Sequence, residues 1–393
     1  MQISIFFRKF IILLYKYLNT AFGVLFRNLL SFQFSRTMQY VTIKDVARAL
    51  FVSVATVSRA FNDKYDVKKE TRELILRKAK EMGYKPNPIA RKLLQKHSFN
   101  IGVIVPEFIN SFFPEVIMGI QEVFLERGYQ VIIMQSNECA QTELENMLFM
   151  EDNMVDGILL SLTKETTNIT HFEHLIQDRF PIVLFNRINE SLPISKVIFN
   201  DYKWALFATE HLIEQGCKKI FHFSGPRHLT LTRNRIRGFE RALEKHKLSF
   251  DESQVIETGF FIEDGERVME HLIKTDNIPD GIFATNDPTA IGALKVLKKY
   301  GYKIPDDVAI VGFSNTKIAE LIEPALTSVE QPTIQMGKVA AGLLLDQLTS
   351  EVAYKPETIV MEGKLIIRDS SLKIKNSRCK IPITRNDFLP NQI

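Results

Sequence analysis

The chain has 393 residues, 45% of them hydrophobic, with a formal net charge of +4. This length and composition exclude a single small domain and indicate two or three globular domains with a large buried core. The charge is uneven: residues 38–97 carry a net +8, and everything after them carries a net −9. A local basic region suits contact with phosphates.

Residues 1–37 are rich in Phe, Leu and Ile and contain five basic and no acidic residues. Their longest uncharged run, 17–26, is too short to span a bilayer, and no small-residue cleavage site is evident. We predict a non-native N-terminal extension. An amphipathic segment at a membrane surface is the alternative.

Residues 41–62 read V-T-I-K-D-V-A-R-A-L-F-V-S-V-A-T-V-S-R-A-F-N and predict two short helices joined by a tight turn. Thr42 and Ser53 are each placed to cap one of them. The buried faces would contain Ile43, Val46, Ala47, Leu50, Val57 and Phe61. The outward side chains of the second helix would be Val54, Ala55, Thr56 and Arg59. This pattern favours a helix-turn-helix, although any amphipathic helical hairpin shows similar spacing.

The motifs V-T-I-K-D-V-A and V-S-V-A-T-V-S-R-A-F-N closely resemble the DNA-binding head of the LacI/GalR (lactose-repressor) family of bacterial transcription regulators. Within residues 38–84, the resemblance implies DNA contacts from Thr42, Ser53, Val54, Ala55, Thr56, Ser58, Arg59 and Asn62. The fork of Arg59 matches two acceptors on a guanine edge, whereas Val54 and Ala55 suit thymine methyl groups. Phe51 stands where the family usually has Gly or Asn, so we expect a slightly altered turn.

Met38 immediately precedes the point where family members usually begin, which supports the predicted extension.

Residues 67–82 predict a third helix, with Gly83 at its C-cap and Lys68 in place of the family's usual capping Ser. Residues 85–98 then form a linker with a short basic helix. It resembles the family's hinge helix, which implies that Leu93 wedges between central base pairs in the minor groove, with Ala90 and Arg91 beside it. A plain linker with a packing leucine is the alternative.

From residue 100 onward, apolar runs alternate with helical patterns. The predicted strands are 101–105, 131–135, 157–162, 182–185, 220–224, 255–258, 281–285 and 308–312. Such alternation implies parallel sheets covered on both faces, in two lobes. Ligands of such sheets bind beyond the carboxyl ends of the strands. The polar and aromatic side chains that follow the runs, Phe112, Asn186 and Asn286 among them, have the chemistry to hold a sugar or similar molecule.

The motifs I-G-V-I-V-P, S-G-P, R-I-R-G-F, T-N-D, I-P-D-D-V-A-I-V-G-F and P-A-L-T-S-V-E-Q-P resemble, in order, the family's periplasmic-binding-protein-like core. The resemblance covers residues 38–373. We therefore expect an all-α head and hinge joined to an α/β core of two doubly wound parallel-sheet lobes. The core would span 99–375, with one lobe from 99–199 and 329–360, the other from 200–328 and 361–375, and a tail from 376–393.

The candidate effector residues combine positions after the strands with positions that match the family's ligand contacts. They are Glu107, Asn110, Phe113, Arg187, Asn200, Arg235, Asp287, Ser314 and Asn315. Ser314 departs from the Asp often found there, which removes one acceptor for effector hydroxyls.

The sequence thus predicts a cytoplasmic, nucleoid-associated homodimer, most simply a repressor, that binds a near-palindromic operator in double-stranded DNA under control of a carbohydrate effector. A membrane-tethered sugar receptor and an enzyme are the alternatives, but no catalytic motif is present. Three widely spaced cysteines suit a reducing cytosol. We assign no cofactor, and the His171 and His174 pair gives no metal site.

Overall fold

The computed structural model describes residues 41–61, 67–85, 97–350 and 354–373, in two compact units that divide between Lys96 and His97. The predicted N-terminal extension, most of the predicted hinge helix and linker, and the whole predicted tail lie outside the described residues. Within the described part of the chain, no helix is both long enough and apolar enough to cross a membrane.

Among its described residues, the first unit contains three helices, α3 (Ile43–Ala49), α4 (Val54–Phe61) and α5 (Lys69–Glu81). Their apolar faces meet in a small core whose buried members are Val46, Ala47, Val57, Ala60, Ile75 and Ala79. The predicted helical pair and third helix are therefore confirmed, with the third helix two residues shorter at its start and one at its end. Gly83 follows its last turn with φ of 71°, and Lys68 occupies the N-cap without a side-chain hydrogen bond.

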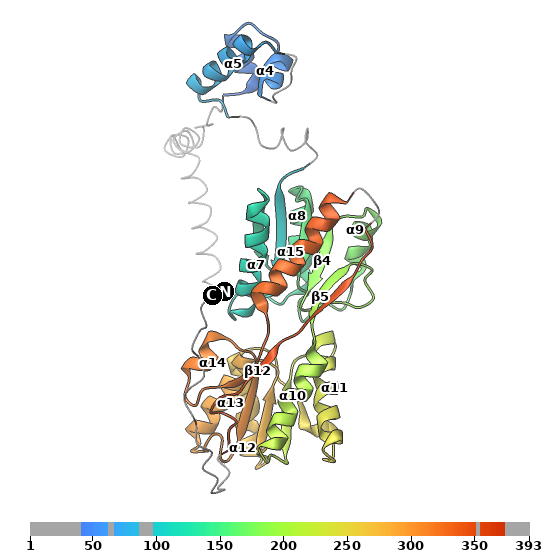
Figure 1. Cartoon of the computed structure of the whole chain (residues 1–393), viewed down its shortest axis with the longest axis vertical. Helices are drawn as coiled ribbons and strands as arrows, with labels where there is room; N and C mark the ends of the chain where they lie inside the picture. The colour runs from blue at the N-terminus through green and yellow to red at the C-terminus, as the bar shows by residue number, and fades with distance from the viewer. Residues whose placement is uncertain (1–40, 62–66, 86–96, 351–353, 374–393) are drawn as a thin grey trace, which may run out of the picture. The chain divides into compact units, whose positions relative to one another are not determined.

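The second unit contains two six-stranded sheets, which define two lobes (Figure 1). The first-lobe sheet has the order β11-β5-β4-β3-β1-β2, and all its strands are parallel. The second-lobe sheet has the order β12-β10-β9-β8-β6-β7, in which only β12 is antiparallel. The strand bounds are β1 Asn100–Val105, β2 Gln130–Gln135, β3 Gly157–Leu160, β4 Ile182–Phe185, β5 Ser195–Phe199, β6 Ile220–Ser224, β7 Val255–Glu257, β8 Gly281–Ala284, β9 Ala309–Ser314, β10 Thr327–Glu330, β11 Thr358–Met361 and β12 Lys364–Ile366.

Helices cover both faces of each sheet, as the strand-helix alternation predicts. In the first lobe, α7 and α15 pack on one face, and α8 and α9 on the other. In the second lobe, α10 and α11 pack opposite α12 and α13. The helix bounds are α7 Phe112–Glu126, α8 Ala140–Asp152, α9 Glu173–Gln177, α10 Asp201–Glu214, α11 Thr230–Lys245, α12 Ile262–Lys274, α13 Asp287–Lys299, α14 Lys317–Leu321 and α15 Thr333–Thr349, with 3₁₀ turns at Thr170–Phe172 and Glu252–Gln254.

The chain crosses between the lobes at residue 200, at 331–332 and at 362–363, so a segment near the C-terminus, α15, lies beside α7 in the first lobe (Figure 1). Hydrogen bonds join two of these crossings. Asn200 donates its backbone N–H to the Met361 carbonyl (2.9 Å), and its side-chain amide to Glu362 (2.8 Å). Glu362 also accepts from the indole of Trp204 (2.9 Å). These contacts around Glu362 form a defined polar cluster where the lobes connect, which we call the interlobe hinge.

Candidate functional site

Helix α4 begins with the capping interaction that its sequence predicts. The Thr56 backbone N–H donates to Ser53 Oγ (3.0 Å), and the two hydroxyl groups lie 2.8 Å apart. Thr42 caps α3 through Asp45, whose carboxylate accepts from the Thr42 backbone N–H (2.9 Å) and hydroxyl (2.6 Å). Both caps satisfy polar groups at the helix starts and so fix where each helix begins.

Within the described residues, the face of α4 that the sequence assigns to DNA is largely exposed. Val54, Ala55 and Arg59 are exposed, and Thr56 and Ser58 are half-buried. The opposite face, with Val57 and Ala60, is fully buried. The Arg72 Nε–H donates to the Ala60 carbonyl (3.1 Å) and ties the end of α4 to α5. Of the other predicted DNA contacts, Asn62, Ala90, Arg91 and Leu93 lie outside the described residues.

The turn between α3 and α4 keeps its left-handed residue although that residue is Phe51. Phe51 has φ of 54°, its N–H donates to the Arg48 carbonyl (3.3 Å), and the Val52 N–H donates to the Ala47 carbonyl (3.1 Å). These two bonds form a Schellman motif, which usually has glycine at the left-handed position. The expected alteration of the turn is therefore wrong, because Phe51 accepts the strained conformation while its ring remains 97% exposed.

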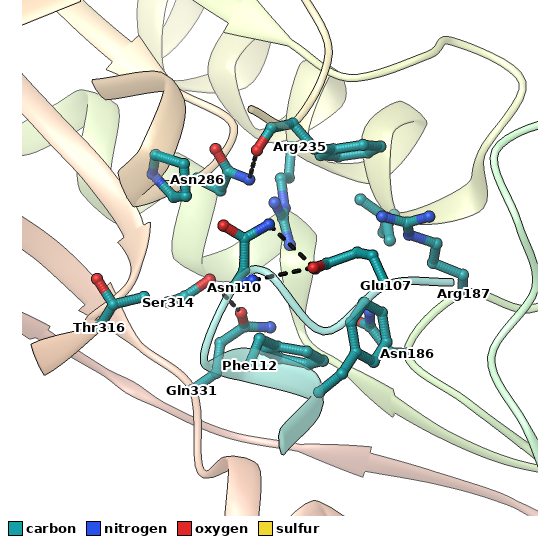
Figure 2. A pocket seen from close by; sticks show the side chains of 14 residues that line it. Glu107, Asn110, Phe112, Asn186, Arg187, Arg235, Asn286, Ser314, Thr316 and Gln331 are labelled. Carbon is teal, nitrogen blue, oxygen red and sulfur yellow. Dashed lines mark hydrogen bonds between the residues drawn. The ribbon is translucent and has the colours of Figure 1, made fainter. Parts of the chain in front are cut away.

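A cavity that opens to solvent lies between the two lobes of the second unit, with about 480 Å³ of atom-free space when the open solvent at its mouth is included. Polar and aromatic side chains from both lobes converge on it (Figure 2). Most of them follow a strand, as the carboxyl-end rule predicts. The lining residues are Glu107, Asn110, Phe112, Phe113, Asn186, Arg187, Leu231, Arg235, Phe260, Asn286, Pro288, Ser314, Thr316 and Gln331.

Arg187 enters the cavity from the first lobe, just after β4. Its Nη1 donates to both carboxylate oxygens of Glu138, each at 2.8 Å, and both side chains are buried. The guanidinium carbon lies 4.4 Å from the ring centroid of Phe260 and 5.7 Å from that of Phe113. In the described part of the chain, Nε and Nη2 of Arg187 have no hydrogen-bond partner, so they are available to a ligand.

Arg235 lines the cavity from α11 of the second lobe. Its Nε donates to Asp201 (2.8 Å), its Nη1 donates to the Thr285 carbonyl, and its guanidinium lies 3.8 Å from the Phe313 ring centroid. Burial raises the pKa of Asp201, and the neighbouring guanidinium opposes that shift. These contacts hold Arg235 in one place within its own lobe.

Acceptors and amide groups complete the cavity. Glu107 accepts from the backbone N–H and the side-chain amide of Asn110 at 2.9 and 3.0 Å, and Ser314 donates to Gln331 Oε1 at 3.1 Å (Figure 2). The Gln331 amide nitrogen is buried and has no hydrogen-bond partner among the described residues. A buried donor without a partner is costly, so this group would gain from a ligand oxygen.

Three predicted effector residues do not line the cavity, and each of them makes side-chain hydrogen bonds within the protein instead. Asn200 caps α10 and binds Glu362. Asn315 donates to Glu330 (2.8 Å). Asp287 accepts from Ser328 Oγ (2.5 Å) and from the backbone N–H of Thr316 (2.6 Å), and burial raises its pKa to about 6. Since Thr316 lines the cavity, Asp287 supports the cavity wall from behind.

Five lining residues were not anticipated from the sequence: Leu231, Phe260, Pro288, Thr316 and Gln331. Gln331 directly follows β10, a strand that the apolar-run criterion passes over, so recognising that strand would have found it. Thr316 follows the predicted pair Ser314 and Asn315 after β9. Leu231 lies at the start of α11 and Phe260 in the loop before α12, and no local sequence pattern marks either residue.

Glu143 is a further buried acid, and it lies in the first lobe. Glu143 accepts from the Thr163 backbone N–H (2.8 Å) and the Thr166 hydroxyl (2.9 Å), and His171 Nε2 lies 3.9 Å away. Burial raises the pKa of Glu143 to about 7. Within the described ranges, no three His, Cys, Asp or Glu side chains are grouped to bind a metal ion.

Two family models match the chain: that of the bacterial regulatory proteins of the lacI family over residues 42–87, and that of a periplasmic binding protein-like domain over residues 209–371. A ribose operon repressor from Halalkalibacterium halodurans is 35% identical over 339 residues, which are 86% of this chain and 98% of the relative. A complex of the transcriptional regulator CelR with cellobiose has a TM-score of 0.65 and 29% identity, over 84% and 99% of the two chains.

A LacI-family regulator from Enterococcus faecium with bound ribose has a TM-score of 0.62 and 26% identity, over 70% of this chain and all of that one. Head, two-lobed core and central cavity together define a DNA-binding transcription regulator with a small-molecule cavity. The chain belongs to the LacI family of bacterial regulatory proteins.

Proposed function

We propose that this regulator is a repressor whose operator affinity is controlled by a sugar or sugar derivative bound in the interlobe cavity. The observation that carries the proposal is the convergence of Arg187, Glu107 and Gln331 with aromatic rings at the carboxyl ends of strands from both lobes. Hydroxyl groups of a sugar can accept from the arginine and amide and donate to the carboxylate, while apolar ring faces stack on phenylalanine. The ribose and cellobiose complexes of similar proteins support this ligand class.

Control of DNA binding follows from linkage. A ligand that contacts both lobes binds some lobe arrangements better than others and shifts their populations by that difference in affinity. The polar hinge around Glu362 gives the two lobes a defined axis for that change. The operator affinity changes to the extent that the DNA-binding form of the regulator prefers one of these arrangements.

We infer that the regulator acts on the nucleoid in the cytoplasm as a homodimer on a near-palindromic operator, because a two-fold symmetric pair of heads requires two related half-sites. Each α4 would present Arg59 to a guanine edge and the small apolar pair Val54 and Ala55 to thymine methyl groups. The exposure of these three side chains, opposite the buried Val57, supports this assignment.

The test is selection of bound duplexes from a random DNA pool by the full chain, followed by sequencing. The proposal predicts enrichment of a palindromic site, and the Arg59→Ala variant serves as the control that loses preference at one base pair per half-site. The enriched duplex then serves as a probe for sugars, beginning with D-ribose and cellobiose. A regulator that enriches no sequence, or whose operator affinity no sugar changes, would contradict the corresponding part of the proposal.

A further inference from the structure

Glu138 does not line the cavity, yet it contacts two of the segments that form the first lobe's side of it, and also the loop that follows β3. Its carboxylate binds Arg187 and accepts from the Lys164 backbone N–H (2.9 Å), and its own N–H donates to the Pro106 carbonyl (3.1 Å). Pro106 immediately precedes the lining residue Glu107. Glu138 therefore joins the loops that follow β1, β3 and β4 at one buried point.

The backbone at Glu138 is held in an unusual conformation. Asn137 and Glu138 both have left-handed φ angles, 54° and 59°. Two successive non-glycine residues in this region are strained, and such strain persists only where the surrounding contacts hold it. Here the conformation places a buried carboxylate, 6% exposed as a residue, against the guanidinium of Arg187.

Arg187, which Glu138 binds, contacts a residue of the second lobe across the cavity. The guanidinium belongs to the first lobe, but the ring nearest to it is that of Phe260, which follows β7 in the second lobe. A cation over an aromatic face is attracted more strongly where water is excluded, and Phe260 is buried. Any rotation of one lobe against the other must change this contact.

We propose that Glu138 is a positioning residue of the effector site. It fixes Nη1 of Arg187, which holds the guanidinium against Phe260 and leaves Nε and Nη2 free for a ligand bridging the lobes. The part of this inference that concerns the ligand rests on the proposed function. The contact between the lobes is independent of which ligand binds.

The experiment compares the full chain with its Glu138→Gln, Phe260→Leu and doubly substituted variants, with D-ribose binding measured by calorimetry. Glu138→Gln keeps the shape of the side chain but removes the charge that strengthens its hydrogen bonds to Arg187. We expect about tenfold weaker binding, since hydrogen bonds to charged groups contribute about that factor or more. Glu126→Gln, which removes an exposed carboxylate at the end of α7 in the first lobe, should bind D-ribose like the unsubstituted chain.

The measurement that distinguishes positioning of Arg187 from general stabilisation of the fold is whether the effect of Glu138→Gln on D-ribose binding depends on Phe260. If Glu138 acts through the Arg187–Phe260 contact, Glu138→Gln should weaken binding by no more than about twofold once Phe260 is leucine. Equal losses in both backgrounds, or unchanged binding by Glu138→Gln, would overturn the inference.

Urea unfolding of the same four proteins provides a readout without ligand. Non-additive effects on the unfolding midpoint are expected, and additive effects would count against the contact. If the unsubstituted chain binds no D-ribose, the choice of ligand in the proposed function fails, while the unfolding cycle still decides the inference.

Discussion

Replacing Phe51 with glycine should stabilise the DNA-binding head. The residue has φ of 54°, and for a residue with a Cβ atom the left-handed region costs about 1–2 kcal/mol. The phenyl ring is 97% exposed, so its loss forfeits almost no buried area. Against this, glycine loses more conformational entropy on folding, by up to about 1 kcal/mol. The expected net gain is about 1 kcal/mol, which is about a fivefold change in the opening equilibrium.

Hydrogen exchange followed by mass spectrometry measures this gain in the intact chain. Peptides from 43–61 contain the buried Val57, whose N–H donates to the Ser53 carbonyl. In Phe51→Gly, exchange of these amides should be about five times slower. Phe51→Ala is the matched control, because it removes the same ring but keeps the Cβ atom. Equal slowing by alanine, or none by glycine, would refute the assignment of strain to the backbone.

Three further results are expected. Glu143 has its pKa raised from 4.5 to about 7, so its contribution to stability is complete below about pH 4.5 and is lost as the pH rises through 7. Glu143→Gln should remove up to about 3 kcal/mol of this pH-dependent loss, measured by urea unfolding at a series of pH values. The control Glu145→Gln, at an exposed position, should leave the pH dependence unchanged. Glu362→Ala should lower stability by about 1 kcal/mol, given its half-exposed position, and an unchanged midpoint in urea unfolding followed by Trp204 fluorescence would contradict the hinge role. Arg59→Ala should relax specificity at one base pair per half-site by about 1–3 kcal/mol, and an equal loss on every sequence in binding assays would reassign it to phosphate contact.

The strands that could be predicted from the sequence are those built from apolar runs, and all eight are present. Two of the four that were missed, β5 and β10, contain polar residues that the fold buries with partners. Lys196 of β5 donates to two backbone carbonyls, those of Leu192 and Ile194. In β10, Thr327 lies 2.6 Å from the Ser371 hydroxyl, and Ser328 donates to a buried acid. The partners in β10 come from distant parts of the chain, so no local pattern reveals them.

The cavity was predictable where a polar residue follows a recognised strand and its side chain keeps hydrogen-bonding capacity toward the cavity. Glu107 and Arg187 meet both conditions. Asp287 meets only the first, because Ser328 and Thr316 occupy its carboxylate. Asn200 follows β5, a strand that was missed, and Glu362 holds its amide. Position after a strand therefore identifies candidates, but tertiary hydrogen bonds decide which of them face the ligand.

The two cavity arginines look equivalent in the sequence, but the structure gives them different relations to lobe movement. Each is paired with a buried carboxylate and lies over a phenylalanine ring. For Arg235, the carboxylate of Asp201 and the ring of Phe313 belong to the same lobe as the arginine, so rotation of the lobes leaves this arrangement intact. Arg187 is anchored in the first lobe and stacks on Phe260 of the second. A change in the angle between the lobes therefore alters the contact of Arg187 with Phe260 and leaves the pairing of Arg235 as it is, which is why the proposed coupling to the ligand is assigned to Arg187.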